Sequence, residues 1–364
     1  MRRNLLQLWR SPALFGIAAL ALGAGPWLPA RAAEKGRIVE VKVHGRALEG
    51  NLEGESADRD VLIYLPPSYA SNTARRYPVV YLLHGYLVSN RYWIGAGLRN
   101  IVPGVDVPGA MNKDIANATG REMIVVMPDA RTKYGGSMYS SSVTSGDWES
   151  YIADDLVEYI DSHYRTLAAS ESRGLAGHGI GGYGTIRIAM KHPGVFSSIY
   201  ILSACCLMNN PAAFARYNTR KDRGRAEGDR DADDASPPIG DVVRAEAAAW
   251  SPDPRKPPSF FDLPDGSDDA SDALIIAKWA ANSPLAMIDQ YIPSLKRGSA
   301  IGMDVGSRDG LKFGNAKLSE VLTAYGIAHS FETYQGNHVD HIGRRIEQKV
   351  IPFFSQHLAF GKNP

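Results

Sequence analysis

The chain has 364 residues, of which 44% are hydrophobic and 22% charged, and its formal net charge is +1. This composition is typical of a globular protein, and the nearly neutral charge gives no reason to expect a nucleic acid or an acidic polymer as partner. The only cysteines, Cys205 and Cys206, are adjacent, a pattern that excludes a multi-disulfide framework and matches no zinc-ligand spacing.

The first 32 residues have the pattern of an export signal. A basic start with Arg2 and Arg3 precedes the apolar run 13–24, and Ala30-Arg31-Ala32 is a small-x-small cleavage site. We predict cleavage after Ala32, a mature chain of residues 33–364 without stable membrane insertion, and a periplasmic or secreted location. Either the general secretion route or the twin-arginine route fits. An uncleaved membrane anchor is the alternative, which the cleavage site disfavours.

The mature chain alternates strand and helix patterns. Residues 37–45 alternate apolar and polar, and 60–69 form a second strand pattern that ends in prolines, which together predict two antiparallel strands at the start of a sheet. Runs that are apolar on both faces predict buried parallel strands at 77–85, 123–129, 172–177, 196–206 and 299–306. Helical patterns occupy 148–164, 183–192, 316–325 and 342–357. The sequence therefore predicts an α/β fold, with a mostly parallel sheet and helices on both faces.

An insertion at about 209–293 interrupts this alternation. Its segment 219–238 mixes both charges and has no apolar residue larger than alanine, so we expect an exposed loop. The following part carries Trp250, Phe260 and Trp279, which predicts a packed cap over one edge of the sheet.

Candidate catalytic residues follow the predicted strands. In α/β sheets, chemistry takes place at the carboxyl ends of the strands. The turn 177–182 follows the third parallel run, Asp304 and Asp309 lie at the end of the fifth, and a final short strand at 331–338 ends in His338. The chain order of turn, acid and histidine is that of the α/β-hydrolase triad.

Several motifs together make the resemblance specific. They are "YLLHGY", "PDARTKYGGSMY", "GLAGHGIGGYGTIRIAMKHPGVF", "DVGSRDG" and "YQGNHVDHIGRRIEQKVIPFF". The chain resembles the putative-esterase family of α/β hydrolases, with S-formylglutathione hydrolases, feruloyl esterases and antigen 85-type mycolyltransferases. The resemblance covers nearly all of the mature chain outside the insertion. It implies hydrolysis of a carboxylic ester, or acyl transfer, on a small-molecule substrate, with no cofactor and no metal.

The same resemblance assigns roles to individual residues. Asp309 corresponds to the family's acid and His338 to its general base, with Asp304 and His341 as the competing residues. A carboxylate fixes the tautomer of such a histidine and stabilises its protonated form. The backbone N–H groups of Tyr86 and Ile180 correspond to the oxyanion hole.

The sequence departs from the family at the nucleophile. The family pattern Gly-x-Ser-x-Gly is here Gly177-His178-Gly179-Ile180-Gly181, so that Gly179 stands where the serine is expected. A dinucleotide-binding loop is disfavoured, because no acidic residue follows in the next strand. Two interpretations stay open: a non-catalytic protein that binds small molecules in the same pocket, and hydrolysis by water activated without a covalent intermediate.

Other side chains are secondary candidates. A displaced nucleophile among Ser141, Ser142, Ser203 and Cys205 is a further alternative, although none lies on the strand-to-helix turn. We expect Trp93 and Trp148 to line the substrate pocket. His84 and His178 are expected to support their turns. Cys205 and Cys206 are expected either as two packed thiols or as a vicinal disulfide.

Overall fold

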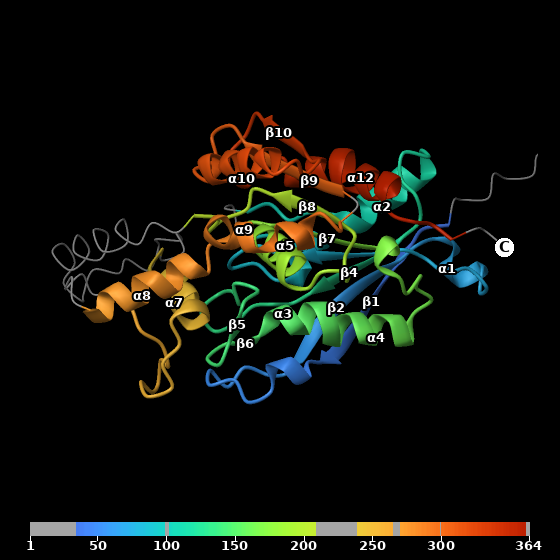
Figure 1. Cartoon of the computed structure of the whole chain (residues 1–364). Helices are drawn as coiled ribbons and strands as arrows, with labels where there is room; N and C mark the ends of the chain where they lie inside the picture. The colour runs from blue at the N-terminus through green and yellow to red at the C-terminus, as the bar shows by residue number, and fades with distance from the viewer. Residues whose placement is uncertain (1–33, 99–101, 209–238, 265–269, 299, 362–364) are drawn as a thin grey trace, which may run out of the picture. The chain divides into compact units, whose positions relative to one another are not determined.

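The computed structural model describes residues 34–98, 102–208, 239–264, 270–298 and 300–361 (Figure 1). The predicted export signal and the charged segment 219–238 lie outside these residues. Within the part described, no helix combines the length and the apolar character needed to cross a bilayer.

An eight-stranded sheet forms the centre of the fold. Its strand order is β1-β2-β4-β3-β7-β8-β9-β10. The strands are β1 (Arg37–His44), β2 (Asp58–Leu65), β3 (Val79–Leu83), β4 (Ile124–Pro128), β7 (Arg173–His178), β8 (Ser198–Leu202), β9 (Ala300–Gly306) and β10 (Ser330–Tyr334). β2 runs antiparallel to both β1 and β4, whereas all other pairs are parallel. The mostly parallel sheet with an antiparallel start is therefore confirmed.

Two hydrophobic cores lie on opposite faces of this sheet. Along β3, Tyr81 and Leu83 belong to one core and Val80 and Leu82 to the other, as the two-residue period of a strand requires. The first core includes residues of α4 (Leu156–His163), α5 (Ile180–Lys191), α9 (Pro284–Leu295) and α10 (Lys312–Ala324). The second includes residues of α2 (Val107–Ala116), α11 (Ile342–Arg345) and α12 (Ile351–His357). The predicted helix layers on both faces are confirmed.

Some helix boundaries differ from the sequence-based prediction. The helix expected at 148–164 is α3 (Trp148–Ser150), a π-helical turn (Tyr151–Asp155) and α4 in direct succession. α5 begins at Ile180 rather than at the predicted Tyr183. The prediction omitted the first turn of this helix, because that turn is rich in glycine and shows no apolar period. α2 was not predicted, since Pro108 and Gly109 in its first turn resemble a loop.

The described part of the insertion forms helices α7 (Ile239–Trp250), α8 (Ala270–Ala281) and α9. The indole Nε1 of Trp250 donates to Ser140 Oγ at 3.1 Å. The Thr144 hydroxyl donates to the backbone oxygen of Phe260 at 2.5 Å. These bonds attach the cap to the β5–β6 hairpin (Ser141–Ser142 and Gly146–Asp147) and its flanks. In Figure 1, α7 and α8 lie to the left of that hairpin.

Candidate active site

The turn between β7 and α5 holds Gly179 in a conformation suited to glycine. Its φ is +61° and its ψ is −116°, which an L side chain adopts only with strain of about 1–3 kcal/mol. The turn is packed closely on both sides. A Cβ on Gly177 would lie 2.3 Å from the backbone oxygen of Gly181, and a Cβ on Gly181 would lie 2.3 Å from that of Leu83. The flanking glycines therefore allow α5 to start directly at the sheet.

A histidine–carboxylate pair faces this turn. Nδ1 of His338 lies 2.9 Å from Oδ2 of Asp309, and Oδ1 of Asp309 accepts the N–H of Leu311 at 2.9 Å. Burial alone would raise the pKa of the Asp309 carboxyl, but the hydrogen bond and the charge of His338, with the Leu311 amide, lower it overall. Asp309 is 7% exposed and ionised near neutral pH. The carboxylate therefore holds the proton of His338 on Nδ1.

The other ring nitrogen of His338 points at Gly179. A Cβ built on Gly179 would have His338 Nε2 as its nearest neighbour, at 3.3 Å, followed by His338 Cε1 at 3.6 Å. The next atom is Gly85 Cα, at 3.8 Å. The structure thus brings together the three residues that the sequence analysis placed at the ends of separate strands.

The two candidate oxyanion donors belong to segments that flank the same space. Ile180 is the first residue of α5, where backbone N–H groups have no acceptor within the helix and the helix dipole favours negative charge. Tyr86 follows Gly85, the residue whose Cα lies next to the Gly179 position. A Cβ on Gly136 would lie 2.5 Å from Ile180 Cδ1 and 3.4 Å from the Tyr86 ring, so that Gly136 lies between them.

His84 fixes the segment that carries Tyr86. Nε2 of His84 accepts the N–H of Ala130 at 2.9 Å, so its proton resides on Nδ1. Nδ1 in turn donates to the backbone oxygen of Gly85 at 2.8 Å. His84 is completely buried, which agrees with its expected role in supporting this turn.

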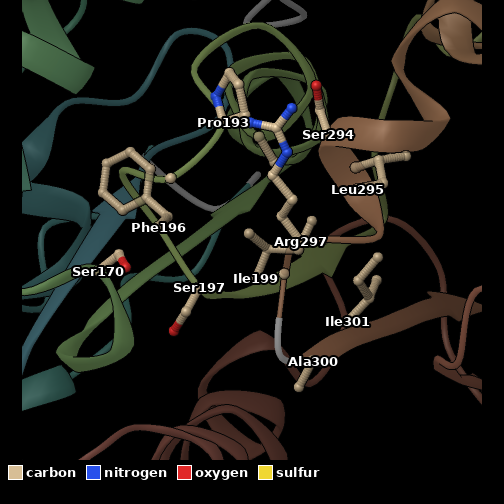
Figure 2. Close-up of a pocket in the computed structure, with 13 residues that line it drawn as sticks. Ser170, Pro193, Phe196, Ser197, Ile199, Ser294, Leu295, Arg297, Ala300 and Ile301 are labelled. Atoms are coloured by element: carbon tan, nitrogen blue, oxygen red, sulfur yellow. The ribbon is translucent and has the colours of Figure 1, made fainter.

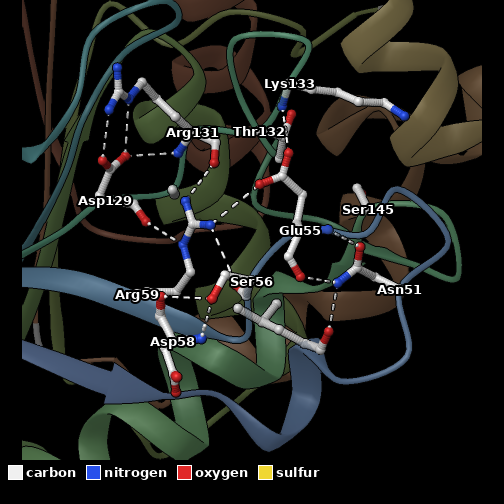
Figure 3. A network of polar contacts seen from close by, with 12 residues as sticks. Asn51, Glu55, Ser56, Asp58, Arg59, Asp129, Arg131, Thr132, Lys133 and Ser145 are labelled. Atoms are coloured by element: carbon white, nitrogen blue, oxygen red, sulfur yellow. Dashed lines mark hydrogen bonds and ion pairs between the residues drawn. The ribbon is translucent and has the colours of Figure 1, made fainter.

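A second network holds the loop 129–136 in place (Figure 3). The guanidinium of Arg59 donates to the backbone oxygens of Asp129 at 3.2 Å and Arg131 at 2.6 Å, and it lies over the Trp148 ring. Glu55 accepts from Arg59 at 3.4 Å and from the Lys133 N–H at 2.7 Å. Arg59, a residue of β2, therefore anchors this loop. The loop ends in Gly135 and Gly136, which lie against Tyr86. The sequence did not indicate Arg59, because the two backbone oxygens that it binds lie about seventy positions away.

The competing acid, Asp304, has a different partner. Its Oδ2 accepts Nε of Arg345 at 2.9 Å and the hydroxyl of Tyr200 at 2.9 Å. Arg345 also binds both oxygens of Glu332. Burial raises the pKa of Asp304 to about 6, although Arg345 opposes this shift. Asp304 is therefore part of a buried ion network, and the acid next to His338 is Asp309. The competing histidine, His341, is exposed at the start of α11.

The expectation that two tryptophans line the substrate pocket is wrong. Trp93 and Trp148 are both 0% exposed and belong to the cores on opposite faces of the sheet. A completely buried ring offers no surface to a ligand. Both cysteines are free thiols, so the vicinal disulfide is not formed.

A small cavity with a mixed polar and apolar lining lies at the amino ends of the central strands (Figure 2). It has a volume of about 40 Å³ and includes Ser197 and Ala300, at the amino ends of β8 and β9, with Phe196, Leu295 and Arg297 around them. This volume accommodates water molecules rather than an ester substrate. The cavity is therefore separate from the site at the carboxyl ends of the strands.

Comparisons with known proteins agree with this geometry. The family model described as "Putative esterase" matches residues 55–341. An esterase of Mycobacterium tuberculosis is 30% identical over 141 residues, which are 38% of this chain and 27% of that protein. An endo-1,4-beta-xylanase/feruloyl esterase of Xylanibacter ruminicola is 29% identical over 147 residues, 39% of this chain and 19% of that protein. The aligned region thus spans less than a third of either relative.

Solved structures share the fold. A ferulic acid esterase superposes with a TM-score of 0.61 at 18% identity, covering 89% of this chain and all of the other. The S-formylglutathione hydrolase of Staphylococcus aureus superposes with a TM-score of 0.57 at 15% identity, covering 88% and 99%. The matched region, the strand order and the superpositions agree: the chain belongs to the esterase family and has the α/β-hydrolase fold.

Proposed function

We propose that this protein cleaves the carboxylic ester of a small molecule, or transfers its acyl group, at the space between Gly179 and His338. The observation that carries the proposal is the pairing of His338 with Asp309 on one side and its 3.3 Å approach to the Gly179 Cβ position on the other. A histidine arranged in this way can take a proton from an attacking group and return it to the leaving alcohol.

The backbone supplies the second part of the chemistry. Attack on an ester carbonyl places negative charge on the carbonyl oxygen, and fixed N–H donors stabilise that charge. Two backbone N–H groups next to Gly179 are the proposed donors. One belongs to Ile180, at the start of α5, and the other to Tyr86, which follows Gly85. The similar proteins named as feruloyl esterases and as an S-formylglutathione hydrolase, which acts on a thioester, support an acyl substrate.

The proposal is tested with p-nitrophenyl acetate and butyrate. We expect the unaltered protein to release p-nitrophenol slowly, and His338→Gln to lower the enzyme-dependent rate by at least about 10², the low end of what general base catalysis contributes. His357→Gln, which changes an exposed histidine on α12, is the matched control and should leave the rate unchanged. Equal rates for the unaltered protein and His338→Gln, with both folded, would contradict the proposal.

A second candidate function follows from one observation. Gly179 has no side chain to form an acyl intermediate, so the site could serve to bind a small molecule without turnover. Micromolar binding of a carboxylic acid or an ester, measured by calorimetry on a protein that shows no hydrolysis dependent on His338, would favour this candidate.

Export is proposed from the sequence of the first 32 residues. The basic start, the apolar run and the Ala30-Arg31-Ala32 site support it. The mass of the protein recovered from the cell envelope or the medium should correspond to a chain that begins at Ala33. A full-length chain confined to the cytoplasm would contradict this proposal.

A further inference from the structure

Gly179 places no side chain opposite the free nitrogen of His338. No atom other than those of its own turn lies closer than 3.3 Å to the point where a Cβ would be. The nearest is His338 Nε2, whose lone pair is available because Asp309 holds the ring proton on Nδ1. That point is one bond length from the Gly179 Cα, so a water molecule lies beside it, at van der Waals distance from the Cα, where Nε2 can accept its hydrogen bond. The His338 side chain is 39% exposed, so that solvent can enter.

Two of the side chains considered as displaced nucleophiles, Ser142 and Ser203, are unsuited to replace a serine, and so is Cys206, the neighbour of Cys205. The hydroxyl of Ser142 donates to the backbone oxygen of Ala248 at 2.6 Å, and Ser203 is completely buried. The thiol of Cys206 donates to Glu246 at 3.5 Å. A hydrogen bond with Cys205 and burial raise the pKa of the Cys206 thiol well above its usual value, so the reactive thiolate is disfavoured.

We propose that the nucleophile at this site is a solvent water bound to Nε2 of His338 beside Gly179, and that ester cleavage takes place without an acyl-enzyme. This inference rests on the proposed ester hydrolysis. The water oxygen forms a bond to the ester carbonyl carbon while Nε2 of His338 takes one water proton. The tetrahedral oxyanion, facing the Ile180 and Tyr86 amides, then collapses. The bond to the leaving oxygen breaks, and His338 returns the proton to it. The products are one carboxylic acid and one alcohol.

Two substitutions at the same position separate this route from a covalent one. Gly179→Ala and Gly179→Ser add the same Cβ, at the same backbone strain and 3.3 Å from Nε2, and differ only in the hydroxyl. The alanine methyl group lies against Nε2, crowds the water bound there and supplies no nucleophile. We expect Gly179→Ala to lower the hydrolysis dependent on His338 by at least about 10², because the base loses the water on which it acts.

A fluorophosphonate probe detects any activated side chain. We expect no covalent adduct on the unaltered protein by intact mass, and a single adduct, at position 179, on the Gly179→Ser variant. Rapid quenching with p-nitrophenyl acetate should show an acetylated protein only for that variant. Circular dichroism and thermal melting establish that each variant is folded. If Gly179→Ala does not fold, the adduct measurements on the unaltered protein and on Gly179→Ser still decide.

Three results would contradict the water route, and one of them would also contradict the proposed function. Hydrolysis that depends on His338, with an acyl or phosphonyl adduct on Cys205, Ser141 or another residue of the unaltered protein, overturns the water route while leaving the proposed function intact. Full activity of folded Gly179→Ala also overturns it. Absence of any hydrolysis dependent on His338 overturns the proposed function and this inference together.

Discussion

His178 lies against His338, with ring centroids 4.5 Å apart, and its Nε2 donates to the backbone oxygen of His338 at 2.8 Å. The two residues are 160 positions apart in the chain. His178 is 4% exposed, and burial, with the nearby His338, lowers its pKa to about 3. A neutral imidazole thus supports the histidine that faces Gly179, and it fixes the backbone of the loop from which His338 extends.

This contact predicts a loss of stability in acid. The folded protein keeps His178 neutral down to about pH 3, whereas the unfolded chain binds a proton below about pH 6.5. His178 therefore makes its full contribution to the free energy of unfolding above pH 6.5, and this contribution is lost as the pH falls toward 3. From pH 6.5 to pH 5, this group should lower the free energy of unfolding by about 2 kcal/mol.

Urea unfolding at pH 6.5 and pH 5 measures this effect. His178→Gln should remove most of the difference between the two pH values, while His357→Gln, at an exposed position, should keep it. An unchanged pH dependence in folded His178→Gln would show that another group is responsible.

Glu246 predicts the opposite dependence on pH. This side chain of α7 is 5% exposed, and one of its oxygens accepts the Cys206 thiol. Burial raises its pKa to about 8, against an ordinary value of 4.5. The folded state therefore holds a proton that the unfolded chain releases between pH 4.5 and pH 8, and stability falls as the pH rises through this range.

Glu246→Gln removes this ionisation. We expect the variant to be more stable than the unaltered protein at pH 8 by on the order of 3 kcal/mol, with the difference shrinking at pH 5. Guanidinium unfolding at the two pH values measures it. A variant that is less stable at pH 8 would contradict a buried, protonated Glu246.

Asp304, within β9, and Asp309, after it, are expected to respond differently to the same substitution. Asp309→Asn removes the carboxylate that orients His338 and should lower ester hydrolysis by about 10²–10⁴, with little effect on the melting temperature. Asp304→Asn leaves Arg345 partly unpaired in a buried network and should cost about 3–5 kcal/mol of stability. Activity and melting are measured for both variants. A loss of activity in folded Asp304→Asn that equals the loss in Asp309→Asn would contradict this division.

The sequence was sufficient for the features that depend on local pattern. Apolar runs predicted the parallel strands, and the rule that parallel strands end at one edge predicted that Gly179, Asp309 and His338 meet. It was not sufficient where pairing depends on long-range packing. Nothing in the composition around Asp304 shows that Arg345 will neutralise it, and the amphipathic character of a tryptophan does not reveal that Trp93 and Trp148 are completely buried.

We propose that the site is an esterase site which lacks only the nucleophilic side chain. Gly179→Ser tests it most directly, since the backbone already has the turn geometry and the half-exposed His338 can move the few tenths of an ångström that a Cβ requires. The measurement is the rate of p-nitrophenyl ester hydrolysis. We predict a rise of at least about 10² over the unaltered protein. An unaltered protein that already turns over at an ordinary rate of about 1–10³ per second, or a folded Gly179→Ser variant with no gain, would contradict the claim.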